Sequence, residues 1–333
     1  MRIQRVAGLG LLLVVTAGCG SSSPSGPSDA PDPKVLEGRT VNAIDGAAAP
    51  GLSVQVGPRS ATSDADGFFR VDVGGPSTHS VRVRGNAIVE RETAVTGPGA
   101  EPAQLSLIPA AFDLESFDEM FRPSGPLQRW TTRPSLVVLA SVMRYTAGAR
   151  EEYAATAEQL PDDDVAQLVA HLEEGLSLLT SGTFTSFASV EIERPAAGER
   201  ASVNRAGKIV MGRYNGIVSL ANTIGYGQWS LRADGSVGGG AMFLDRDFDT
   251  NDNRRRLLRI HELGHALGLM HVTHRASIMN PSIGADVTDF DRAAAKIAFQ
   301  RPTGNRAPDV DPSGSASIRA NSPLVWAPPV FCR

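Results

Sequence analysis

The chain has 333 residues, a formal net charge of −4 and 41% hydrophobic residues. This near balance of charge gives no reason to expect nucleic acid as a partner, and the length is enough for about two domains with packed cores. A low aromatic fraction of 6% and 34 glycines favour a strand-rich fold with many turns.

Residues 1–18 have the pattern of a secretory signal peptide. Arg2 and Arg5 form a positive start, and the apolar run that follows is too short to cross a bilayer as a helix. Positions 16–19 read T-A-G-C, which resembles the lipobox of bacterial lipoproteins. The resemblance implies lipidation of Cys19 and an extracytoplasmic, lipid-anchored protein. A plain secretory signal with an incidental cysteine, and hence a secreted protein, is the alternative.

The only cysteines are Cys19 and Cys332. If Cys19 is acylated, Cys332 is a free thiol, and a bridge between the two is the alternative. Residues 19–34 are rich in Ser, Pro, Gly and Asp, and they contain too few apolar residues to fold. They are therefore predicted to form a flexible linker.

Residues 35–108 are predicted to form an all-β sandwich domain. Three segments alternate apolar and polar residues, as half-buried strands do; they are 52–56, 69–73 and 81–84. Segments 50–54 and 62–69 resemble the carboxypeptidase regulatory-like (transthyretin-like) sandwich, which implies an accessory module. Asp64 and Asp66 are interpreted as turn-forming residues rather than calcium ligands.

Residues 109–134 are interpreted as a connector, and residues 135–305 have a mixed pattern of strands and helices. Strands are predicted at four segments: 136–143, 190–193, 208–212 and 237–244. Helices are predicted at three: 165–179 with leucines on one side, 253–267, and a closing helix over 293–299.

Helix starts are predicted from acidic and hydroxyl residues. The three acids Asp162, Asp163 and Asp164 are interpreted as an N-cap and as partners of the helix dipole. Thr250 or Asp252 is expected to cap the helix over 253–267. Residues 306–333 are rich in Pro, Asp and Ser and are predicted to be a loose tail.

The strongest chemical signal begins at His261 and reads H-E-x-x-H-x-x-G-x-x-H. His261 and His265 are four residues apart, so a helix presents both on one face, where two imidazoles can bind one Zn²⁺. Gly268 allows the helix to end in a left-handed turn, after which His271 can return as a third ligand. Three protein ligands leave the fourth position open, which is typical of a catalytic zinc site. Glu262, beside the first ligand, is the predicted general base.

This motif, followed by Met279 in the segment S-I-M-N-P, resembles the metzincin metallopeptidases, and its wording is similar to the matrixin branch. The resemblance implies an α+β catalytic domain with a twisted sheet and a long active-site helix. It also implies that the three histidines are zinc ligands and that Met279 lies in a tight turn beneath them. Arg129-Trp130 resembles the start of matrixin catalytic domains.

The segment before the active-site helix resembles the matrixin edge strand, against which an extended substrate pairs. This interpretation assigns Gly240, Ala241 and Met242 to the substrate wall. Met242 and Leu244 stand where matrixins tend to carry a histidine for a structural zinc and an aspartate for calcium. One catalytic zinc and no second zinc are therefore expected.

Acidic residues follow this segment at Asp245, Asp247 and Asp249. They offer oxygen ligands for calcium, but a solvated acidic turn is the favoured interpretation. His274 is interpreted as a loop histidine exposed to solvent. Neither cysteine lies in a Pro-Arg-Cys-Gly context, so the cysteine-based latency of matrixin zymogens is not visible in the sequence.

These observations together predict a zinc-dependent endopeptidase acting on peptide or protein substrates. One alternative is a cell-surface binding lipoprotein in which the sandwich recognises a ligand and the zinc domain is degenerate. Another is a zinc hydrolase that acts on cell-wall peptide crosslinks. The site motif does not separate these activities, and it leaves the physiological substrate and the oligomeric state open.

Overall fold

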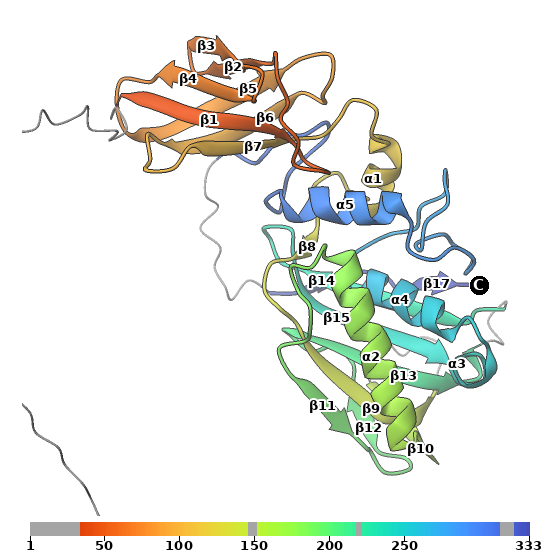
Figure 1. The fold of residues 1–333 in the computed structure, drawn as a ribbon. Coiled ribbons are helices and arrows are strands. Elements are labelled where there is room, and N and C mark those ends of the chain that lie inside the picture. The colour runs from red at the N-terminus through yellow and green to blue at the C-terminus, as the bar shows by residue number, and fades with distance from the viewer. Residues whose placement is uncertain (1–33, 146–151, 218–221, 314–322) are drawn as a thin grey trace, which may run out of the picture.

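The computed structural model describes residues 34–145, 152–217, 222–313 and 323–333. The predicted signal peptide, Cys19 and all but the last residue of the predicted linker lie outside this part. Two units are visible: a strand-rich N-terminal unit and a larger unit of sheet and helices (Figure 1). Among the described residues, no helix combines the length and apolar character needed to cross a membrane.

The N-terminal unit consists of two small antiparallel-rich sheets, ordered β4-β1-β7 and β3-β2-β5-β6. Their strands are β1 Val35–Asn42, β2 Ser53–Val56, β3 Arg59–Thr62, β4 Phe68–Asp72, β5 Ser77–Arg84, β6 Arg91–Gly97 and β7 Ala103–Leu107. Inward-facing residues of both sheets, such as Phe69 and Val83, form one core. The alternating segments predicted as strands lie in β2, β4 and β5, and this arrangement fits the expected sandwich.

The turn between β3 and β4 is shaped by an aspartate side chain. Asp64 accepts hydrogen bonds from the backbone N–H groups of Asp66 and Phe68, at 3.0 and 2.8 Å. An aspartate that bonds to the backbone two residues further on stabilises a turn by itself. The turn-forming interpretation of Asp64 is therefore confirmed.

A large sheet forms the second unit, and its order is β12-β10-β9-β13-β15-β14-β16, with β11, β17 and β8 pairing to β9, β14 and β15. Its strands are β8 Arg129–Trp130, β9 Ser135–Arg144, β10 Glu152–Gln159, β11 Val190–Glu193, β12 Arg200–Ser202, β13 Lys208–Asn215, β14 Gly225–Leu231, β15 Ser236–Asp245, β16 Val325–Trp326 and β17 Val330–Cys332. β9, β13 and β15 run parallel, and β14 runs antiparallel to β15. The four strands predicted between 136 and 244 are all present.

Helices α2 and α4 contact each other across one face of this sheet (Figure 1). In the part of the chain that the structure describes, the helices are α1 Leu114–Phe121, α2 Asp162–Leu179, α3 Arg246–Asn251, α4 Arg255–Ala266 and α5 Asp289–Phe299. α2 buries Leu168, Leu172, Leu176 and Leu179, the stripe that its period predicted. α5 begins with a capping box in which Thr288 and Asp291 each bond the other's backbone.

Two of the predicted helix caps are wrong. Asp162, Asp163 and Asp164 lie in the first turn of α2, where they suit the helix dipole, but the N-cap position is Pro161. α4 begins at Arg255 rather than 253, and Arg254 occupies its N-cap without a side-chain bond. Neither Thr250 nor Asp252 caps it, because Thr250 lies within the short helix α3 and Asp252 is the C-cap of that helix.

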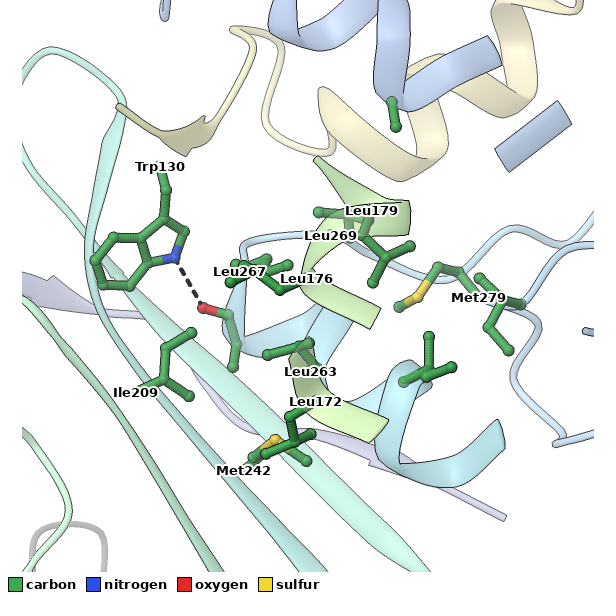
Figure 2. Packing of buried hydrophobic residues seen from close by; sticks show 14 of the residues in the cluster. Trp130, Leu172, Leu176, Leu179, Ile209, Met242, Leu263, Leu267, Leu269 and Met279 are labelled. Carbon is green, nitrogen blue, oxygen red and sulfur yellow. Dashed lines mark hydrogen bonds between the residues drawn. The ribbon is translucent and has the colours of Figure 1, made fainter. Parts of the chain in front are cut away.

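Apolar side chains fill the layer between the sheet and the helices. Figure 2 shows Leu172 and Leu176 of α2 and Leu263 of α4 packed over Met242 of β15. The indole N–H of Trp130 donates to the carbonyl of Ala266 at 3.2 Å, which ties β8 to the last turn of α4 (Figure 2). This layer fixes the position of α4 on the sheet.

The predicted loose tail at 306–333 is wrong for its described part. Asp309 is fully buried between Arg91 of β6 and Arg301, with contacts of 2.8 and 2.7 Å, so residues after α5 join the two units. Further along, β16 and β17 pair with β14. The Pro- and Ser-rich composition conceals these short strands because the partner β14, rather than local periodicity, stabilises them.

Residues 109–134 are also more than a connector. α1 places Phe117, Met120 and Phe121 in the main core with less than 1% of each exposed, and β8 pairs with β15. Eight helical residues with a short apolar face give too weak a period to stand out in the sequence.

Candidate metal centre

Helix α4 and the turn after it bring three histidines together. His261 and His265 lie one helical turn apart on α4, and both are completely buried. The helix ends at Ala266, and Gly268 has a φ of +99°, the left-handed region that favours glycine. A Cβ at Gly268 would approach Val237 to 2.8 Å. The chain therefore reverses here, as predicted, and returns His271 to the other two rings.

The three ring nitrogens have spacings suited to one metal ion. The Nε2 atom of His265 lies 3.1 Å from Nε2 of His261 and 3.1 Å from Nε2 of His271. Zinc–nitrogen bonds of about 2.0–2.1 Å in a tetrahedron would place ligand nitrogens about 3.3 Å apart. The predicted ligand set is thus assembled in the structure, and it fits Zn²⁺.

Backbone carbonyls fix the orientation of two of these rings. The Nδ1–H of His261 donates to the carbonyl of Ile278 at 2.7 Å, and that of His265 donates to the carbonyl of Leu269 at 2.7 Å. Each Nε2 is then left as an acceptor, which is the atom a metal needs. Burial lowers the pKa of His261 to about 3 and the pKa of His265 well below its usual value, so both imidazoles are neutral.

Met279 lies in a turn that packs beneath α4. A Cβ placed on Gly264 would lie only 2.4 Å from the Met279 sulfur, so this glycine permits the contact. Figure 2 shows Met279 in the same apolar layer as Leu179 and Leu263. The sequence resemblance implied a position beneath the histidines; the structure packs Met279 against Gly264, which lies on α4 between His261 and His265.

The methionine turn is held by a residue that sequence reasoning missed. Asp291 of α5 accepts hydrogen bonds from the Ser277 hydroxyl and, at 3.0 Å, from the Ile278 N–H. Ile278 also supplies the carbonyl that orients His261. The T-x-x-D pattern at 288–291 marks Asp291 as part of a helix cap. The pattern gives no indication that Asp291 also holds the methionine turn.

Glu262 is buried beside the histidines without a partner. It has no exposed surface, and neither carboxyl oxygen finds a hydrogen-bond partner of ordinary geometry among the described residues. Burial raises the pKa of this carboxyl well above its usual value, and the nearby Cys332 thiol lowers it in part. A buried carboxyl group without hydrogen-bond partners reduces the stability of the fold unless a ligand or water supplies those partners. This fits a site built around a metal ion and its water.

Glycines on the sheet let α4 lie unusually close to it. A Cβ at Gly225 would come within 2.4 Å of the Glu262 Oε1 atom, and one at Gly227 within 2.4 Å of the His265 Cβ. On β15, a Cβ at Gly240 would lie 2.5 Å from the Ala266 carbonyl. The sequence interpretation did not assign Gly225 or Gly227 to the site, since glycine spacing alone does not indicate a close approach.

The assignment of Gly240, Ala241 and Met242 to an edge strand is wrong. These residues lie in β15, which pairs with β13 on one side and β14 on the other. Met242 instead points into the layer beneath α2 (Figure 2). The strand beyond β15 is β14, which precedes it in the sequence and was not predicted as a strand. Its outer side pairs with β16 and β17.

Of the three acidic residues at the end of β15 and in α3, Asp247 is exposed, but Asp245 and Asp249 are buried, which corrects the interpretation of a solvated turn for these two. Asp245 accepts hydrogen bonds from the N–H groups of Asp247 and Phe248 and so caps α3. Asp249 is fully buried and contacts the guanidinium groups of Arg213 and Arg259, each at 2.7 Å. Because Arg259 belongs to α4, this ion pair anchors the metal-binding helix.

Cys332 lies at the same point as the histidines, which the sequence did not indicate. Its Sγ atom is 2.9, 3.5 and 3.6 Å from the Nε2 atoms of His261, His265 and His271. The thiol is buried and has no disulfide partner among the described residues; Cys19, the partner in the alternative bridge, lies outside them. Cys332 reaches the site because β17 pairs with β14.

A comparison with protein-family models finds a similarity over the same region. The matrixin family model of metallopeptidases matches residues 215–296, which include the three histidines, Glu262 and Met279. The N-terminal unit and residues 323–333 lie outside the match. A search of curated proteins gave no match. The family match supports a metzincin-like metallopeptidase domain around this site.

Proposed function

We propose that the chain is a zinc-dependent endopeptidase whose site is formed by His261, His265, His271 and Glu262. The observation that carries this proposal is the convergence of three imidazoles, two of them fully buried, beside an unpaired buried carboxyl group. The Nε2 atom of His265 lies 3.1 Å from the Nε2 atoms of both other histidines. Three protein nitrogens are the donor set of catalytic zinc. The matrixin match over this region supports the same chemistry.

When bound, zinc would supply a polarised scissile carbonyl and a water of lowered pKa. The residues of the chain orient the metal ligands and transfer the proton. The carbonyls of Ile278 and Leu269 keep two imidazoles in the tautomer that presents Nε2. Glu262 accepts a proton from the attacking water and delivers it to the leaving amine.

The remaining parts of the proposal concern location and substrate. The lipobox-like residues 16–19 support an extracytoplasmic protein anchored by lipid at Cys19. Such a protein would act on peptides or proteins outside the cytoplasm, and the N-terminal unit would be an accessory module. If this is so, Cys19→Ser releases the full chain from the membrane fraction into the soluble fraction. Retention of that variant in the membrane fraction would contradict the anchor.

The catalytic proposal is tested by measuring zinc content and casein cleavage for the full chain and for Glu262→Gln. Because glutamine preserves shape but does not accept the proton, we expect about one zinc per chain in both proteins and cleavage that depends on Glu262. His265→Ala serves as the control that loses zinc. Equal cleavage by the Glu262→Gln variant would rule out Glu262 as the base.

A further inference from the structure

We propose that Cys332 is a fourth zinc ligand, and that residues 323–333, here called the capping segment, hold the site in a closed, latent state. This inference rests on the proposed function of the same histidines. It assigns to the site a ligand that comes from outside the region matched by the family model.

The position of the sulfur is that of a ligand. The Sγ atom lies 2.9, 3.5 and 3.6 Å from the three Nε2 atoms, and all four donor atoms fall within 4.8 Å of one another. Zinc bonds of about 2.0–2.1 Å to nitrogen and about 2.3 Å to sulfur would place sulfur about 3.6 Å from each nitrogen. The distances to His265 and His271 match this value, and the distance to His261 is shorter. A cysteine that merely filled apolar space would have no reason to face three imidazole acceptors.

A fourth protein ligand changes what the site can do. Catalytic zinc keeps one position open for water or substrate, whereas zinc with four protein ligands of Cys and His type is structural and closed. Cys332 also lies beside Glu262, whose carboxyl must reach the attacking water. With Cys332 in place, both the open position and the approach to the base are occupied.

Strand pairing explains how the capping segment reaches the metal. β17 runs antiparallel to β14, with Cys332 opposite Gly225 and Val330 opposite Gly227. The Ile224 N–H also donates to the Cys332 carbonyl at 2.9 Å. Gly225 and Gly227 are the residues that lie directly against Glu262 and His265. The pairing therefore sets Cys332 over the metal ligands.

The same pairing occupies the side of the sheet that an extended peptide would use. An unpaired edge strand can bind a peptide by adding it to the sheet as a further strand. β16 and β17 fill this position along β14, and the Phe331 ring packs on Tyr226 with centroids 5.5 Å apart. A substrate must therefore displace the capping segment, and displacement also removes Cys332 from the metal.

The test uses the full chain with Cys19→Ser, so that Cys332 is its only cysteine. Zinc-edge X-ray absorption of the zinc-loaded protein should show one sulfur at about 2.3 Å together with nitrogens at about 2.0–2.1 Å. Replacing Cys332 with Ala in the same background should remove the sulfur and leave the nitrogens. Because the fourth metal position is then open and strand pairing alone holds the capping segment, casein displaces it more readily, and cleavage should rise about tenfold or more.

The outcomes separate this inference from the proposed function. Zinc held by nitrogen and oxygen alone, with Glu262-dependent cleavage, would overturn the role of Cys332 and leave the peptidase standing. A sulfur ligand combined with cleavage that Cys332→Ala does not raise would overturn the closure. Failure of the folded protein to bind zinc would contradict the peptidase and, with it, the fourth ligand.

Discussion

Helix α4 and the capping segment deliver donor atoms to the same point by different means. The histidines of α4 follow from spacing along one helix, so four residues suffice to align two rings. Cys332 lies 61–71 residues further along the chain and arrives only because β17 pairs with β14. A local motif therefore reveals the chemistry of a site, whereas long-range strand pairing decides whether the site is open.

The two regions also differ in how firmly the fold holds them. α4 is anchored by the Asp249 ion pair, by the Trp130 indole and by close contact with glycines of the sheet. β17 is held along one side of one strand. We therefore expect substitutions at the contacts that hold α4 on the sheet to reduce the stability of the fold. Substitutions in the capping segment should instead alter access to the metal.

The largest loss of stability is expected from Asp249→Ala. The substitution leaves the buried guanidinium groups of Arg213 and Arg259 without their shared partner, which should cost about 3–5 kcal/mol. Urea unfolding measures this change. Asp247→Ala is the matched control, because the Asp247 side chain is 72% exposed and should change stability by about 0.5 kcal/mol or less. Equal effects of the two substitutions would refute the anchoring role of Asp249.

A smaller loss is expected from Gly240→Ala. The added methyl group would lie 2.5 Å from the Ala266 carbonyl, so α4 must move away from β15 at a cost of about 1–3 kcal/mol. Gly284→Ala is the control, since its nearest neighbour is 3.9 Å away. In thermal unfolding, Gly240→Ala should have a clearly lower midpoint temperature than Gly284→Ala. If Gly240→Ala were as stable as the control, α4 would not depend on this close contact.

The smallest effect on the fold is expected from Cys332→Ala without zinc. Losing one buried thiol in a segment held along one side should cost about 1 kcal/mol or less when the metal is chelated. With zinc present the cost should be larger, because the variant also loses a metal bond. Urea unfolding with and without a chelator gives the difference, and Cys19→Ser is the control. If zinc does not change the stability cost of Cys332→Ala, Cys332 is not a zinc ligand.

The sequence predicted the parts of the site that depend on short-range geometry. The three histidines, Glu262 and Gly268 occupy the expected places because the helical turn and the left-handed glycine fix them within eleven residues. The leucine stripe of α2 and the C-terminal end of α5 at Phe299 were visible for the same reason, as periodicity within one element, although α5 begins four residues earlier than predicted.

What the sequence concealed depends on partners distant in the chain. β17 lies among prolines, and Cys332 has no motif around it, so only β14 shows where it goes. The outer strand was assigned to 240–242 because β14, rich in glycine, lacks the usual alternation. Asp249 looked like a solvated acid because its partners Arg213 and Arg259 come from other elements.

The most direct test combines Glu262→Gln with Cys332→Ala and measures zinc content and casein cleavage for the wild type, both single variants and the double variant. We expect about one zinc per chain in all four. Cys332→Ala should cleave fastest, and adding Glu262→Gln should lower that rate by about 10²–10⁴-fold. A double variant that cleaves as fast as Cys332→Ala, or a chain that folds without binding zinc, would contradict the account.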